Sequence, residues 1–199
     1  HSIADFRKIN ATALQNLFKL FVSFLKDAGL VGGKVISVDG TKIRGNNSKK
    51  NNYNPKKIQR HLDYIEQKSK ALLEEFEQTD ASEDEAISLG DVQEKLARLQ
   101  QHKIKYEALQ DQLAQSQEPQ VSTTDPDARA LLVRGVVVEV GYNVQAAVDQ
   151  EHKLVVATHT INRNDKNALY AISKEAKDNI EAKQLTVLAD KGYHTGKEL

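Results

Sequence analysis

The sequence contains neither cysteine nor methionine among its 199 residues. Without cysteine the chain can form no disulfide and no thiolate metal site, so carboxylate, carbonyl, amide or histidine groups must hold any metal. Carboxylates together with water favour the hard ions magnesium, manganese or calcium. Because methionine is missing and the first residue is His1, we expect a piece cut from a longer protein.

Long apolar runs are also missing. No stretch approaches the roughly 20 apolar residues that cross a bilayer, and no secretory signal opens the chain. We therefore expect a soluble, cytoplasmic protein without a membrane partner. A chain of 199 residues can build a full hydrophobic core in one or two domains.

The formal net charge is zero, but the charges are unevenly distributed along the chain. Residues 1–60 carry 12 Lys or Arg against 3 Asp or Glu, whereas residues 61–120 carry 6 against 14. A basic N-terminal third is what a phosphate-backbone partner would need. A basic surface that only faces solvent explains the same counts.

Residues 34–43 form the most informative stretch. Val35, Ile36 and Val38 are β-branched and nearly continuous, which predicts a strand covered on both faces that ends at Gly40. This strand would deliver the Asp39 carboxylate to its carboxyl end, at the rim of an α/β core, where binding sites are common. The alternative is a turn, because Asp-Gly is a frequent turn pair.

A helix and a polar loop flank this strand. Apolar residues recur at helical spacing from about residue 11 to residue 28, and Gly29 matches a glycine-terminated helix end. The basic, asparagine-rich loop 42–54 has donors that suit phosphate oxygens. A solvated linker is the alternative for this loop.

Residues 55–118 show heptad-like spacing in two segments separated by an acidic, turn-like stretch, which predicts an inserted antiparallel helical hairpin with a coiled-coil seam. Self-packing is the favoured use of the seam; the domain core or a second subunit, as in a homodimer, are the alternatives. The seam residues are Ile58, Leu62, Ile65, Leu72, Phe76, Val92, Leu96, Leu99, Tyr106 and Leu113.

After the hairpin the pattern returns to strands. Residues 136–148 alternate, with Tyr142, Val144, Ala146 and Val148 on one face, and should pair antiparallel with residues 154–161. Asp165 can cap a helix from about residue 166 to residue 182. A short strand at 184–189 then ends on Asp190, as the first strand ends on Asp39.

The two strand-end aspartates form a constellation that neither makes alone. With the hairpin set aside, the order of elements is strand, strand, strand, helix, strand, which resembles a ribonuclease H-like α/β fold with a mixed sheet. In that fold the first and fourth strands lie side by side, so Asp39 and Asp190 would be neighbours. Like charges that close stay ionised when a cation lies between them, which favours a metal site.

Four segments carry a family resemblance. They are 38–44 (VDGTKIR), 125–129 (DPDAR), 141–149 (GYNVQAAVD) and 189–193 (ADKGY). In this order they resemble the catalytic domain of DDE transposases from bacterial insertion sequences, in the branch that carries a helical insertion after the first acidic residue. The resemblance runs from about residue 3 to residue 199.

The resemblance implies a site, cofactors and partners. Asp39 matches the first acid and Asp190 the second, each a ligand for two Mg²⁺ or Mn²⁺ ions. The third acid, a glutamate on a later helix, has no match, and Glu198 is a poor candidate for it. The parent protein would be a DNA-cleaving and DNA-joining enzyme of the bacterial nucleoid acting on double-stranded transposon ends and target DNA, while the fragment alone should be inactive.

Four basic residues lie next to the two acids in sequence and are candidates for contacts with DNA phosphates: Lys42, Arg44, Lys191 and His194. A solvent-facing structural role is the alternative for each. Asp125, Asp127, Asp149 and Asp165 have structural explanations in turns, a hairpin or a helix start, although Asp149 could approach the metal site.

The expected domain organisation has three parts. Residues 1–54 hold the first helix and the first catalytic strand, residues 55–118 the hairpin, and residues 119–199 the rest of the core, cut before the third acid. Two alternatives to the enzyme remain: an inactive or domesticated relative that binds DNA or protein, and an oligomerisation module dominated by the hairpin.

Overall fold

The computed structural model describes residues 2–45, 48–80, 89–133 and 135–196. By their internal packing they form two compact units, one made of His1–Gly45 with Leu131–Leu199 and the other of Asn46–Ala130.

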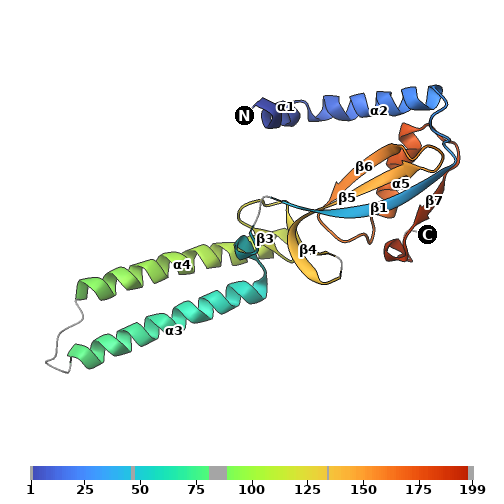
Figure 1. Cartoon of the computed structure of the whole chain (residues 1–199). Helices are drawn as coiled ribbons and strands as arrows, with labels where there is room; N and C mark the ends of the chain where they lie inside the picture. The colour runs from blue at the N-terminus through green and yellow to red at the C-terminus, as the bar shows by residue number, and fades with distance from the viewer. Residues whose placement is uncertain (1, 46–47, 81–88, 134, 197–199) are drawn as a thin grey trace. The chain divides into compact units, whose positions relative to one another are not determined.

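The first unit is a mixed α/β structure (Figure 1). Its elements in chain order are α1 (Ser2–Ile9), α2 (Ala11–Asp27), β1 (Val35–Arg44), β4 (Arg129–Val133), β5 (Val137–Asp149), β6 (Val155–Ile161), α5 (Leu169–Asn179) and β7 (Thr186–Ala189).

The strands form one mixed sheet in the order β4-β5-β1-β7, with β6 also paired to β5. The long β5 runs antiparallel to β1 and to β6, as expected for the β5–β6 pair. In contrast, β1 and β7 are parallel neighbours. The expectation that the first and last strands lie side by side is therefore confirmed. Strand β4, which pairs with β5, was not expected from the sequence.

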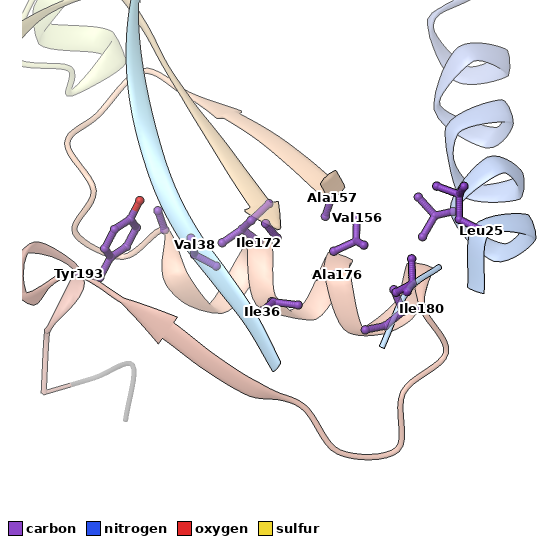
Figure 2. Packing of buried hydrophobic residues seen from close by; sticks show 13 residues of the cluster. Leu25, Ile36, Val38, Val156, Ala157, Ile172, Ala176, Ile180 and Tyr193 are labelled. Atoms are coloured by element: carbon purple, nitrogen blue, oxygen red, sulfur yellow. The ribbon is translucent and has the colours of Figure 1, made fainter. Parts of the chain in front are cut away.

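The hydrophobic core of this unit lies between the sheet and α5 (Figure 2). Helix α5 contributes Ile172, Ala176 and Ile180, each fully buried, against strand residues that include Ile36. Helix α2 adds Val22 and Leu25 to the same cluster. This core explains the apolar periodicity of α5. On α2 it covers Val22 and Leu25, while Leu17, Leu20, Phe21 and Phe24 are exposed.

Strand β1 differs from the expectation in two ways. It continues through Gly40 to Arg44, so Asp39 lies within the strand and not at its end, and the alternative of an Asp39–Gly40 turn is wrong. Only one face is buried: Ile36 and Val38 pack in the core, while Asp39 on the opposite face is exposed. The strand continues because antiparallel pairing with β5 extends as far as Arg44.

The burial of the two faces of β5 also differs from what its apolar alternation predicts. The apolar set with Val144 and Ala146 is only half-buried, whereas the alternate, polar positions Asn143, Gln145 and Asp149 are almost completely buried. Ala147 shares that buried face and belongs to the α5 core. The strand therefore turns polar side chains inward.

The C-terminal end of α2 agrees with the sequence prediction, whereas the N-terminal start of α5 does not. Helix α2 ends as expected: Gly29 has a φ of 73°, and the N–H groups of Gly29 and Leu30 donate to carbonyls of the last turn. Helix α5 begins at Leu169, later than expected, and no side chain caps it. The capping role given to Asp165 is wrong, because its carboxylate bonds to other side chains.

The second unit holds the helical hairpin, α3 (Pro55–Asp80) and α4 (Leu89–Ser116), with the short strands β2 (Asn52–Tyr53) and β3 (Val121–Ser122) paired at its base. The two helices lie alongside each other (Figure 1). Their contact buries Ile58 and Leu113 of the predicted seam, together with Leu109, which was not predicted. Helix–helix packing on itself, the favoured use of the heptad pattern, is therefore confirmed within this unit. The proposed capping residues Ser82 and Glu85 lie outside the described residues.

Within the described ranges, no helix is both long and apolar enough to cross a membrane.

Asp149 organises the turn between β5 and β6. It is 1% exposed, and its carboxylate accepts N–H groups of Gly33, Glu151 and His152. Burial acts to raise the pKa of Asp149, but these backbone hydrogen bonds outweigh it and lower the pKa below its ordinary value. Asp149 pairs with Ile36, three positions along β1 from Asp39, so its role is to hold this turn.

We predict that Asp149→Asn destabilises the protein by roughly 1–3 kcal/mol at pH 7, because at least one buried N–H loses an ionised acceptor. The native carboxylate stabilises the fold above its unfolded pKa of about 3.9 and loses that contribution as the pH falls through its lower folded pKa. Chemical denaturation from pH 3 to pH 7 measures both effects. The control is Asp178→Asn, an exposed position on α5; an equal loss in both variants would contradict the role of Asp149.

Candidate metal-binding site at the β1–β7 edge

The two candidate aspartates are brought together by the register of β1 and β7. The parallel pairing runs from Val35 with Thr186 to Val38 with Ala189. Asp39 and Asp190 are the residues that directly follow this last pair. The structure therefore brings together two positions that are 151 residues apart in sequence.

Strand alternation decides which face of the sheet carries Asp39. Residues at alternate positions of a strand share a face, and paired residues of neighbouring strands point to the same side. Ser37 pairs with Leu188, and Asp39 lies two residues beyond Ser37 on the same face, while Asp190 directly follows the last residue of β7. Ile36 and Val187, which pair on the other face, pack in the α5 core. Asp39 thus lies on the face opposite to α5, and Asp190 lies just beyond the end of the neighbouring strand.

Each carboxylate is exposed and is oriented by the backbone that follows it. The N–H of Gly40 donates to Oδ1 of Asp39 at 2.7 Å. The N–H of Lys191 donates to Oδ1 of Asp190 at 2.5 Å, at the start of a 3₁₀ turn, η2 (Lys191–Tyr193). These bonds restrict the orientation of both side chains while leaving the carboxylates accessible from solvent.

Two accessible carboxylates from neighbouring strands fit a hard divalent ion whose remaining ligands are water or substrate oxygens. A complete protein site is not formed by this part of the chain: among the described residues, no group of three or more His, Cys, Asp or Glu side chains could hold a metal ion. Glu198, the weak candidate for a third acid, lies outside the described residues.

The four candidate phosphate contacts divide into two kinds. Lys42 is partly buried, and its ammonium donates to both oxygens of Asp165, at 2.8 and 3.2 Å. Arg44, Lys191 and His194 are exposed. The charge of Lys42 is therefore paired with Asp165, whereas the other three side chains face solvent.

A network of buried and partly buried polar side chains links residues next to the two aspartates, and the sequence did not predict it. Asp165 is its centre: Oδ1 accepts from the amide groups of Asn143 at 2.9 Å and Gln145 at 3.1 Å, in addition to Lys42. The hydroxyl of Tyr193 donates to Oε1 of Gln145. Strand β1, strand β5, the loop before α5 and the turn after β7 are linked by these side chains. A sequence signal did exist, in the polar residues at alternate positions of β5.

Gly40 is part of the same arrangement. It pairs with Gln145 across the β1–β5 ladder. A Cβ at position 40 would lie 2.3 Å from Nε2 of Gln145 and 2.6 Å from Oδ1 of Asp165. The glycine that was expected to end the strand instead leaves room for polar side chains to pass behind it.

Electrostatics fix the protonation states in this network. Burial acts to raise the pKa of Asp165, but hydrogen bonds from Lys42, Asn143 and Gln145 outweigh it and lower the pKa. For Tyr193, burial and then the negative charges of Asp165 and Asp39 raise the pKa. An ionised Asp165 can only accept hydrogen bonds, and a protonated Tyr193 hydroxyl can donate one.

Comparisons of this chain with protein-family models, with curated proteins and with solved structures give no match.

We predict that cysteines placed at the two aspartate positions will form a disulfide. Because each aspartate directly follows the last pair of the β1–β7 ladder, we expect their Cα atoms to lie within the separation of about 4.4–6.8 Å that a disulfide requires. The chain has no other cysteine, so Asp39→Cys/Asp190→Cys can be oxidised and read out by mass spectrometry without interference. A matched control is Thr41→Cys/Thr186→Cys, whose positions on β1 and β7 are out of register. Equal cross-linking of both pairs would contradict the register.

Proposed function

We propose that this chain is part of the catalytic domain of a DDE-class DNA transposase, built on a ribonuclease H-like fold. The observation that carries the proposal is the β1–β7 register, in which Asp39 and Asp190 each directly follow the last residue pair. The helical hairpin between β1 and β5 and the order of the strands agree with that fold. The motif resemblance supplies the particular class of enzyme.

The proposed reaction is divalent-metal-dependent cleavage and joining of DNA strands. Asp39 and Asp190 would hold the metal through carboxylate oxygens, and a third carboxylate would be needed to complete the site. Bound divalent ions supply activation of the attacking oxygen and stabilisation of the leaving oxygen in phosphoryl transfer. The chain's own contribution is to fix the spacing of the two carboxylates and to supply exposed cations at the end of β1 and directly after Asp190.

The partner in this proposal is double-stranded DNA, bound through its phosphates. Arg44, at the end of β1, and Lys191, directly after Asp190, are exposed cations close in sequence to the two acids. Contacts of this kind position a nucleic acid and carry no sequence information. Lys42 is not among the proposed phosphate contacts, because its ammonium pairs with the Asp165 carboxylate.

We predict that Asp39→Asn and Asp190→Asn each weaken Mn²⁺ binding by on the order of tenfold or more. Losing a group that only hydrogen-bonds to a metal ligand already lowers metal affinity by about tenfold, and these substitutions remove a ligand itself. Isothermal titration of the purified chain measures this affinity. Asp178→Asn, on α5, is the control and should bind Mn²⁺ as the native chain does. Undiminished binding by both aspartate variants would refute the proposed metal site.

We predict that Arg44→Ala weakens binding of duplex DNA and reduces the slope of log affinity against log salt by about 1, as expected when one phosphate contact is lost. Fluorescence anisotropy at several salt concentrations measures the slope. Lys177→Ala removes an exposed charge from the last turn of α5 and serves as the control. The phosphate-contact role fails if the slope of the Arg44 variant equals that of the native protein.

A further inference from the structure

We propose that Tyr193, Gln145 and Asp165 form a positioning network that holds the Asp190 end of β7 against β1 and so sets the spacing of the two candidate metal ligands. The inference rests on the proposed function for its consequence, metal affinity, but its structural content does not depend on a metal.

The first step is the link from Asp190 to Tyr193. Strand β7 has four residues, and its paired region ends at Ala189, so Asp190 lies beyond the ladder. The η2 turn holds it: Tyr193 N–H donates to the Asp190 carbonyl at 3.1 Å, and Asp190 Oδ1 accepts from Lys191 N–H. These hydrogen bonds couple the position of Tyr193 to that of Asp190.

The second step is the link from Tyr193 to β1. The Tyr193 side chain is 2% exposed and belongs to the α5 core cluster, where Figure 2 shows it beside Val38. Its hydroxyl donates to Gln145, which is fully buried and pairs with Gly40. Gly40 follows Asp39 directly. The hydrogen bond therefore joins the residues behind one aspartate to the turn that carries the other.

The third step is the direction of the hydrogen bonds. Asp165 is an acceptor, so Gln145 must turn its amide nitrogen toward Asp165 and its amide oxygen toward Tyr193. Lys42 holds Asp165 from the other side and keeps it ionised. A network with one allowed arrangement of donors and acceptors specifies one position for the Tyr193 hydroxyl.

The alternative role for this network is to provide hydrogen-bond partners for its own buried polar groups, without positioning Asp190. That role alone predicts that loss of a hydrogen bond lowers only the global stability of the protein. Positioning also affects the local stability of η2 and the Asp39–Asp190 spacing. The deciding variant is Tyr193→Phe, which keeps the ring in the core and removes the hydroxyl. Tyr64→Phe, an exposed position on α3, is the matched control.

Three measurements on the full chain test the proposal. In Tyr193→Phe we expect faster hydrogen exchange of the Tyr193 and His194 amides relative to the Ile36 amide of β1. We also expect slower disulfide formation in the Asp39→Cys/Asp190→Cys background, and Mn²⁺ affinity lower by roughly three- to tenfold, the effect of one net hydrogen bond. Gln145→Met should reproduce these changes, and the double variant should be no worse than either single one.

The outcomes separate this inference from the proposed function. Native cross-linking and local exchange in Tyr193→Phe, with only a fall in global stability, would overturn the positioning role whether or not the chain binds Mn²⁺. Altered cross-linking and exchange in a chain that binds no Mn²⁺ at the two aspartates would support the network while removing the metal site. All three changes together, absent in Tyr64→Phe, support both.

Discussion

The parallel pairing of β1 with β7 is the interaction on which the candidate site depends. Its backbone hydrogen bonds join segments from opposite ends of the chain and stop at Val38 and Ala189, one residue before each aspartate. Two carboxylates so placed repel each other, so their proximity has to be supported by other parts of the fold. Core packing of Ile36 and Val187 under the same strands supplies part of that support.

The polar network supplies another part, and it explains why β5 buries amides on the side where an apolar core would be expected. Asn143 and Gln145 are completely buried, which costs free energy unless their polar atoms are paired. The ionised Asp165 provides much of that pairing, and Lys42 compensates its charge. A partly buried ion pair such as this one adds little net stability, but it can specify one arrangement of its neighbours. At the β1–β7 edge, we infer that this single arrangement helps to set the position of Asp190.

The sequence predicted most of the elements, although not β4 or the exact bounds of β1 and α5, and the fold that it resembles implied the meeting of the two aspartates. Helical periodicity predicted the hairpin and α2, and the order of strands predicted that β1 and β7 are neighbours. The sequence did not predict the polar network, because the apolar alternation of β5 indicated that the face with Val144 and Ala146 is buried, whereas the opposite, polar face is the buried one. Asp165 resembled a helix cap, since local sequence cannot show that Lys42, 123 residues earlier, lies beside it. Tyr193 likewise gave no local sign of its partner on β5.

The most direct test of the account is a crystal structure of this chain soaked in manganese, with anomalous scattering used to locate the ions. The account predicts Mn²⁺ coordinated by both Asp39 and Asp190 on the sheet face opposite to α5. Manganese bound elsewhere, with the two carboxylates far apart on strands that do not pair, would contradict both the fold and the proposed metal site.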